Sequence, residues 1–136
     1  MTRTSFALAG LFCLLTASCR KPTFDQKILA EVAAYNQRER PFLLADGCTR
    51  RDSLHFDTDT RTYSYCHTIT GEADGNPAVA AYLGKQNRDR LLHELRGSIQ
   101  MIPLKEQGIR VRYVYYSEST KEILADFTFT PADYNP

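Results

Sequence analysis

Histidine and cysteine are the side chains best suited to metal binding and nucleophilic catalysis, and this chain of 136 residues has three histidines and four cysteines. The histidines are His55, His67 and His93, and none of them has the spacing of a zinc motif with another histidine or with a cysteine. In the hairpin predicted below, His55 and His67 point to opposite faces of the sheet, so they cannot share a metal ion. The sequence therefore predicts no metal site.

Nucleophilic catalysis is not indicated either. Cys66 is followed directly by His67, and neighbours in a strand point to opposite faces, so these two cannot form a thiol–imidazole pair. The chain has no G-x-S-x-G turn and no glycine-rich phosphate loop. Residues 57–61 begin like a calcium loop but place Arg61 where a third acidic residue is needed. We expect a protein that is not an enzyme and that needs no cofactor.

Two stretches with helical periodicity and four with strand alternation must position these side chains. The first helix runs from Thr23, which caps it, to Arg40. The second begins at Asn76-Pro77, which supplies the cap and the first helical residue, and ends at Pro103, with Gly84 as a point where it kinks or divides. The predicted strands are residues 50–57, 62–69, 109–116 and 123–129, which form two hairpins.

The alternation of apolar residues predicts the register of both hairpins. In the second hairpin, pairing Tyr113 with Ala125 brings two apolar faces together and sets Arg112 opposite Asp126 on the outer face. The first hairpin pairs Leu54 with Tyr65 and Phe56 with Tyr63.

The elements run in the order α-β-β-α-β-β, which predicts an α+β fold. One antiparallel sheet of two hairpins is expected, with both helices packed against its apolar face. Most of the eight tyrosines and seven phenylalanines are needed for this core. Tyr116 is the tyrosine that we expect to face outward, beside Arg110 and Arg112. These three residues form the predicted binding surface, because exposed tyrosine and arginine are favoured where proteins bind one another.

The first nineteen residues have the pattern of an export signal. Arg3 gives a positive start, residues 5–18 carry no charge, and the apolar run is shorter than the roughly 20 residues that cross a bilayer. The run ends at Leu15-Thr16-Ala17-Ser18-Cys19, which resembles the lipobox of bacterial lipoprotein signal peptides. The resemblance implies cleavage before Cys19 and attachment of diacylglycerol to its sulfur. An ordinary cleaved signal peptide is the alternative.

The resemblance implies three parts: a signal peptide of residues 1–18, a tether of residues 19–23 and a single α+β domain of residues 24–136. Lipid on Cys19 would hold the domain at a membrane, because each buried CH₂ contributes about 0.8 kcal/mol. Arg20 stands where an aspartate retains enterobacterial lipoproteins at the inner membrane, which implies the outer membrane, facing the periplasm. The domain also resembles small bacterial lipoproteins that end in a Pro-x-x-Tyr tail, here residues 131–134, a likeness that implies no function.

Two cysteines remain once Cys13 is removed with the signal peptide and Cys19 carries the lipid. An oxidising compartment favours a disulfide between Cys48 and Cys66, which would stabilise the domain by about 3 kcal/mol. The predicted register places Cys66 opposite Ser53, about 16 Å along an extended strand from Cys48. The bridge therefore requires residues 45–47 to fold back, and two buried thiols are the alternative.

The charge balance argues against a nucleic-acid-binding protein. Of the basic residues, only Arg3 precedes Cys19, so basic and acidic residues are equal in number after that cysteine. The sequence predicts a lipid-anchored, non-catalytic binding or assembly accessory of the cell envelope, with an envelope protein as its partner. The alternatives are an inhibitor of an envelope enzyme, a small-ligand carrier with a pocket between sheet and helices, and a secreted enzyme without a recognisable motif.

Overall fold

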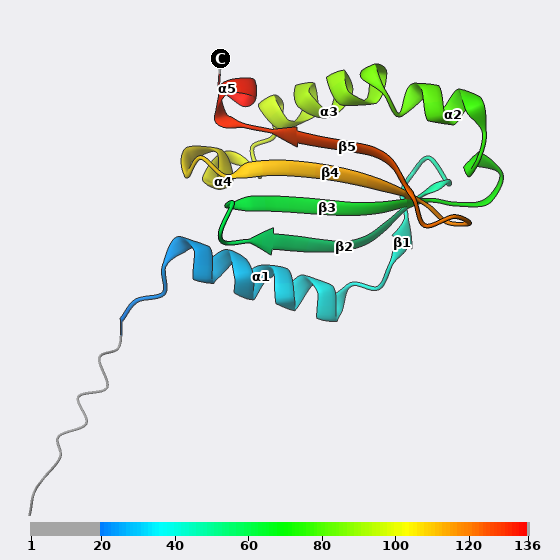
Figure 1. Ribbon diagram of the computed structural model, residues 1–136. Helices are drawn as coiled ribbons and strands as arrows, with labels where there is room; N and C mark the ends of the chain where they lie inside the picture. Colours follow the sequence, from blue (N-terminus) through cyan, green and yellow to red (C-terminus); the bar gives the residue numbers. More distant parts are fainter. Residues whose placement is uncertain (1–19, 136) are drawn as a thin grey trace, which may run out of the picture.

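The computed structural model describes residues 20–135, so the predicted signal peptide and Cys19 lie outside the described residues (Figure 1). The α+β class and the α-β-β-α-β-β order of the main elements are confirmed. No helix within this range is long and apolar enough to cross a membrane. In chain order the elements are α1 (Phe24–Arg38), β1 (Phe42–Leu43), β2 (Thr49–Asp57), β3 (Thr62–Ile69), η1 (Gly71–Ala73), α2 (Pro77–Tyr82), α3 (Lys85–Gly97), α4 (Ile102–Glu106), β4 (Arg110–Ser117), β5 (Ile123–Phe129) and α5 (Pro131–Tyr134).

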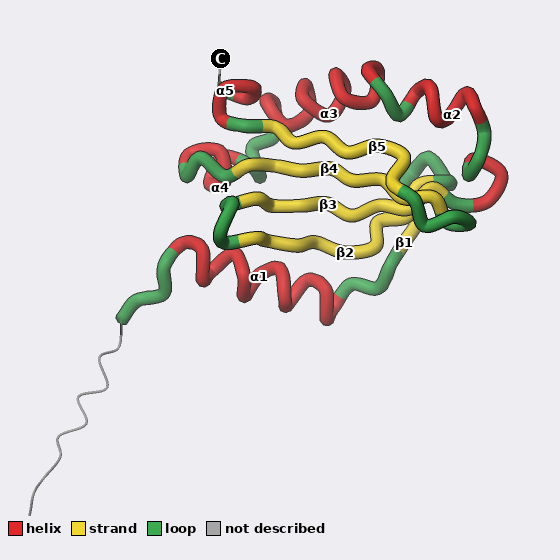
Figure 2. The backbone as a smooth tube through the Cα atoms, in the orientation of Figure 1, coloured by secondary structure: helices red, strands yellow, loops and turns green. Residues whose placement is uncertain are grey.

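The five strands form one sheet in the order β1-β2-β3-β4-β5, which Figure 2 shows side by side. The two predicted hairpins, β2–β3 and β4–β5, are antiparallel. They join through a parallel pair, in which Thr62 lies beside Arg110 and Ile69 beside Ser117. β3 and β4 are parallel because the helical connection between them returns the chain to the end of the sheet where β3 began, as a crossover connection does.

The register of the first hairpin is confirmed, with Leu54 opposite Tyr65 and Phe56 opposite Tyr63. The register of the second hairpin differs from the prediction by two residues, because Tyr113 lies opposite Phe127 and not opposite Ala125. The pair nearest the turn is Tyr116 with Ile123, one residue away from the predicted register, and a bulge next to Tyr115 adds the second residue.

A shift of two residues keeps the side chains of residues 111–115 and 125–129 on their predicted faces, whereas a shift of one would exchange the faces. Ile123 is the exception, because beyond the bulge it lies opposite Tyr116 on the outer face and is 53% exposed. Arg112 therefore still reaches Asp126, now as a diagonal neighbour, and two hydrogen bonds of 2.8 and 2.6 Å join the guanidinium to the carboxylate. The predicted ion pair thus forms, although the two residues are not directly opposite each other.

The predicted long second helix is three separate helices in the structure. Gly84 lies between α2 and α3, so the chain divides where a kink or a break was predicted. The predicted end at Pro103 is wrong: α3 ends at Gly97, and Pro103 lies in the first turn of α4. Proline is well tolerated in a first turn, because the N–H that it lacks has no partner within the helix there.

Two adjoining apolar clusters form the core between the helices and one face of the sheet. Ile28 of α1 belongs to a cluster with Phe56, on the β2–β3 half of the sheet. Leu95 of α3 belongs to a cluster with Phe129, on the β4–β5 half. Tyr65 packs against both clusters, so both lie on the same face. All these contacts are made within residues 20–135, so this range has its own hydrophobic core.

The first helix begins at a capping box, and near its end one amide attaches it to the edge of the sheet. Thr23 forms the predicted cap, and Gln26 completes a capping box with it. Near the end of α1, the Asn36 side chain donates to the carbonyl oxygen of Leu54 and accepts from its N–H, at 2.8 and 2.9 Å. Because β1 pairs with only two residues of β2, this amide satisfies edge groups of β2 that β1 does not reach.

Candidate functional site

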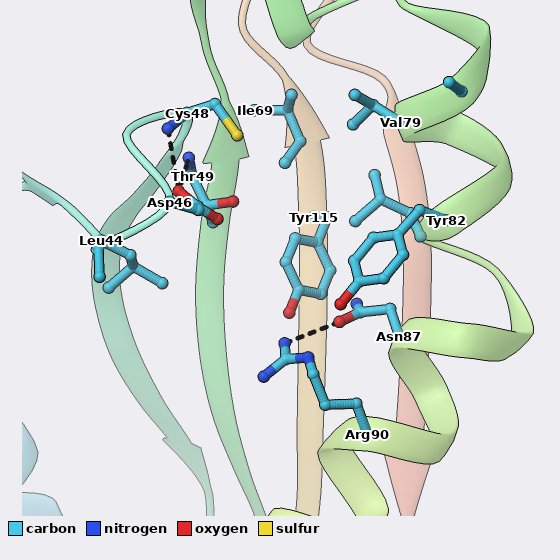
Figure 3. Close-up of a pocket in the computed structure, with 13 residues that line it drawn as sticks. Leu44, Asp46, Cys48, Thr49, Ile69, Val79, Tyr82, Asn87, Arg90 and Tyr115 are labelled. Atoms are coloured by element: carbon cyan, nitrogen blue, oxygen red, sulfur yellow. Dashed lines mark hydrogen bonds between the residues drawn. The ribbon is translucent and has the colours of Figure 1, made fainter.

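A pocket of about 590 Å³ lies between the sheet and the helices, at the end of β3 that leads into the crossover. The loop between β1 and β2 forms one wall, and α2 with the start of α3 forms the other (Figure 3). Ile69 of β3 and Tyr115 of β4 lie between the two walls (Figure 3). The lining is mostly apolar, with a few polar side chains, as is usual for the binding sites of small ligands.

Asp46 shapes the loop that forms the first wall. Its carboxylate accepts hydrogen bonds from the backbone N–H groups of Cys48 and Thr49, at 2.9 and 2.8 Å. Gly47 has a φ of 72°, a conformation that glycine adopts without strain. The carboxylate and the glycine together turn the chain from β1 back into β2, and the loop presents Leu44 and Cys48 to the pocket.

Asn87 of α3 is the most deeply buried polar side chain of the pocket, with 1% of its surface exposed. Its Oδ1 accepts a hydrogen bond of 2.8 Å from the guanidinium of Arg90. Since arginine has donors only, this contact identifies the oxygen of the amide and leaves Nδ2 as the other atom. Nδ2 is buried and has no hydrogen-bond partner within residues 20–135. An amide donor in this position favours binding of a ligand with an acceptor, because leaving the donor unpaired is costly.

A signal for Asn87 was present in the sequence. Leu83, Asn87, Leu91 and Leu95 follow one another at intervals of four, and all four are buried. The three leucines alone give the helical periodicity of this stretch, so the prediction of a helix needed no account of the asparagine between them. One amide in a run of buried leucines indicates either a hydrogen bond within the core or a polar contact for a ligand.

A second cavity, of about 340 Å³, adjoins the pocket and shares Leu44, Arg90 and Tyr115 with it. The parallel pairing of β3 and β4 sets Tyr65 beside Tyr113, and their rings stack with 5.0 Å between ring centres. His67 stacks on Tyr115 in the same way, at 4.9 Å. These side chains line the second cavity, which extends the site along the middle of the sheet.

His67 is held in its neutral form. Burial, and then the positive charge of Arg51, lower the pKa of His67 from 6.5 to about 4. Arg51 also donates a long hydrogen bond of 3.4 Å to Nε2, which a protonated ring could not accept. At neutral pH the imidazole is therefore a neutral ring in the aromatic stack.

This burial predicts a loss of stability in mild acid. The folded-state pKa of His67 lies below its unfolded value, so the unfolded chain binds the proton more readily, and the free energy of unfolding falls as the pH drops from 6.5 towards 4. The shift corresponds to about 3 kcal/mol at the acid end of this range. Urea denaturation between pH 7 and pH 4 measures it. We expect His67→Phe to remove most of this dependence and His93→Phe, at an exposed position, to retain it; an unchanged profile in His67→Phe would contradict the prediction.

The predicted disulfide between Cys48 and Cys66 is wrong, because both cysteines are free. Cys66 lies opposite Ser53 as predicted, but the carbonyl oxygen of Cys48 accepts a hydrogen bond from the N–H of Thr70, at the far end of β3. Cys66 and Thr70 are four residues apart along the chain, which is about 13 Å in a strand. A disulfide requires Cα atoms within about 7 Å of each other. The loop of residues 45–47 does turn, but it leaves Cys48 beside the pocket and not beside Cys66.

The other predicted site residues lie away from the pocket. Arg110, Arg112 and Tyr116 are on β4 and alternate with Val111 and Tyr115, which face the core, so the three share the opposite face of the sheet. Arg110 is exposed, whereas Arg112 is half-buried in its ion pair with Asp126. Their role as a binding surface stays a prediction.

Among the described residues, no three histidine, cysteine or carboxylate side chains lie close enough to hold a metal ion together. The predicted absence of a metal site was argued from spacing alone and stays a prediction.

Comparison with known proteins identifies a family and a similar fold. The sequence profile described as "Domain of unknown function (DUF8479)" matches residues 23–125. The crystal structure of a presumed secreted protein from Pseudomonas aeruginosa is similar, with a TM-score of 0.66 and 11% identity, over 84% of this chain and 99% of that chain. At this identity the likeness concerns the fold alone. No curated protein matches the chain significantly. Because the profile covers the chain from before α1 into β5, the chain belongs to the DUF8479 family.

Proposed function

We propose that this protein is a non-catalytic binding protein of the bacterial cell envelope, which holds a small ligand between its sheet and its α2–α3 helices. The observation that carries the proposal is the pocket of about 590 Å³, within the size range of small-molecule sites. A binding role also fits the buried amide of Asn87, which offers a ligand an otherwise unpaired donor.

Cys48, the cysteine that lines the pocket, is poorly suited to catalysis. Burial and the negative charge of Asp46 raise the pKa of Cys48, so it is a thiol and not a reactive thiolate at neutral pH. This environment supports a role in which the ligand is bound and released unchanged.

The proposed location is outside the cytoplasm. Lipid on Cys19 would anchor the protein to the outer membrane, on the side that faces the periplasm. The lipobox-like residues 15–19 are the argument for the anchor, and Arg20 is the argument for the outer membrane. The similar Pseudomonas protein, which is described as secreted, fits a location beyond the cytoplasm. The Arg110, Arg112 and Tyr116 face remains free in this proposal to contact an envelope protein.

The test is native mass spectrometry of residues 20–136, exported to the periplasm behind an ordinary cleavable signal peptide and purified under non-denaturing conditions. We expect an adduct of defined mass on the unmodified domain. Ala78→Trp fills the pocket, because Ala78 lines it, and should remove the adduct. Ala80→Trp introduces the same side chain two residues along the same helix, outside the lining, and should retain the adduct. A domain without any adduct, or equal adducts on both variants, would refute the proposal.

A further inference from the structure

The pocket has two chemically different ends. Ile69 and Val79 lie together at one end in Figure 3, and Asn87 and Arg90 lie at the other. The hydroxyl groups of Tyr82 and Tyr115 point towards the end that holds Asn87 and Arg90 (Figure 3). A ligand that fills this space must therefore be apolar along most of its length and polar at one end.

The polar end is rich in donors. The Nδ2 of Asn87 is buried and unpartnered within residues 20–135, and the amide oxygen is already occupied by Arg90. Arg90 has donors only, and each tyrosine hydroxyl can donate as well. These donors are complemented by a ligand group that accepts several hydrogen bonds and has no donor of its own.

The two charged side chains that line the pocket, Arg90 and Asp46, lie on opposite walls, and the cation is at the donor-rich end (Figure 3). Arg90 brings a positive charge, which Glu94 balances through a contact of 2.6 Å while lining the neighbouring cavity and not the pocket. Asp46 is the carboxylate on the opposite wall (Figure 3), and although burial opposes its ionisation, hydrogen bonds from Thr49 and Cys48 lower its pKa. Those two backbone donors hold the Asp46 carboxylate, so it does not occupy the amide of Asn87.

We infer that the pocket binds an apolar carboxylic acid, with the carboxylate against Asn87, Tyr115 and Arg90 and the apolar body along Ile69, Val79 and Leu83. This inference rests on the proposed ligand-binding function and adds the chemical class of the ligand. An ionised head group forms stronger hydrogen bonds than a neutral one, so the amide donor discriminates between an acid and the corresponding alcohol.

Asn87→Leu is the decisive variant. Leucine continues the run of Leu83, Leu91 and Leu95, so it fills the same space, and the variant is expected to melt at a temperature no lower than the parent. Decanoic acid and decanol serve as probes, since they differ only in the head group. Isothermal titration calorimetry at pH 7 on residues 20–136, with NMR of the Asn87 side-chain amide, measures affinity and location together.

We expect decanoic acid to bind the parent at least about tenfold more tightly than decanol and to shift the Asn87 amide signal. Asn87→Leu should remove that preference while decanol binds as before, and Ala78→Trp should block both probes. If both probes bind equally to the parent and Ala78→Trp still blocks them, the carboxylate is refuted while the pocket remains a ligand site. If Ala78→Trp leaves binding unchanged, or if neither probe binds, the inference is refuted. The proposed function is then tested separately, by the adducts in the mass-spectrometry experiment.

Discussion

Cys19→Ala is expected to abolish the incorporation of labelled palmitate and to shift the full-length protein out of the membrane fraction. The reason is that the acyl chains on this sulfur would be the anchor, and each buried CH₂ contributes about 0.8 kcal/mol to membrane binding. Two or three chains therefore hold a domain durably, whereas their loss leaves only the charges of Arg20 and Lys21 near the surface.

Cys13→Ala is the matched control, because it replaces the other cysteine of the same apolar stretch, six residues earlier. It should keep both the label and the membrane location. Label on Cys19→Ala, or no label on the unmodified protein, would exclude lipid on Cys19. The lipobox would then be a chance similarity, and the proposed anchor would have to be given up.

Phe129→Ala is expected to lower the free energy of unfolding by about 3–5 kcal/mol, a large part of the 5–15 kcal/mol typical of a domain. Phe129 is fully buried and lies in the cluster between the sheet and α3. Its ring meets Tyr113 edge to face at 6.0 Å, and the guanidinium of Arg88 lies over the ring, 5.2 Å from its centre. Truncation removes the ring from all these contacts and leaves a cavity that a packed strand cannot close.

Urea denaturation of residues 20–136 measures the effect. Phe42→Ala is the control, since Phe42 lies in the edge strand β1 with 41% of its surface exposed, and it should cost less than about 1 kcal/mol. A loss of similar size in the two variants would show that Phe129 is not the centre of the core.

The sequence could predict the local elements and much of their pairing, because alternation and caps are properties of neighbouring residues. Thr23, the first hairpin and the Arg112–Asp126 ion pair are examples. The second register was missed by two residues because apolar alternation repeats every two residues and cannot distinguish such shifts. The pairing at the turn and the bulge next to Tyr115 each shift the register by one residue, and no pattern in the strands indicated either of them.

The pocket could not be predicted in the same way. Its walls come from four parts of the chain: the β1–β2 loop, the end of β3, the α2–α3 segment and β4. They meet only because β3 and β4 pair in parallel, an arrangement that depends on where the crossover helices return the chain. The Cys48–Cys66 bridge failed for a different reason: the register already separated the two cysteines, and the loop of residues 45–47, which had to fold back, leaves the carbonyl oxygen of Cys48 bonded to the N–H of Thr70.

The position of α1 bears on where a ligand enters and leaves the pocket. Arg61 binds Asp25 at 2.9 Å, so α1 begins at the β2–β3 turn, whereas the pocket lies at the other end of β3, roughly 23 Å away along the strand. With lipid on Cys19, the tether of residues 19–23 would span at most about 17 Å, which would keep the start of α1 near the headgroups. The tether alone would therefore not bring the pocket to the headgroups, and we expect the ligand to be exchanged with the aqueous phase or with a second protein.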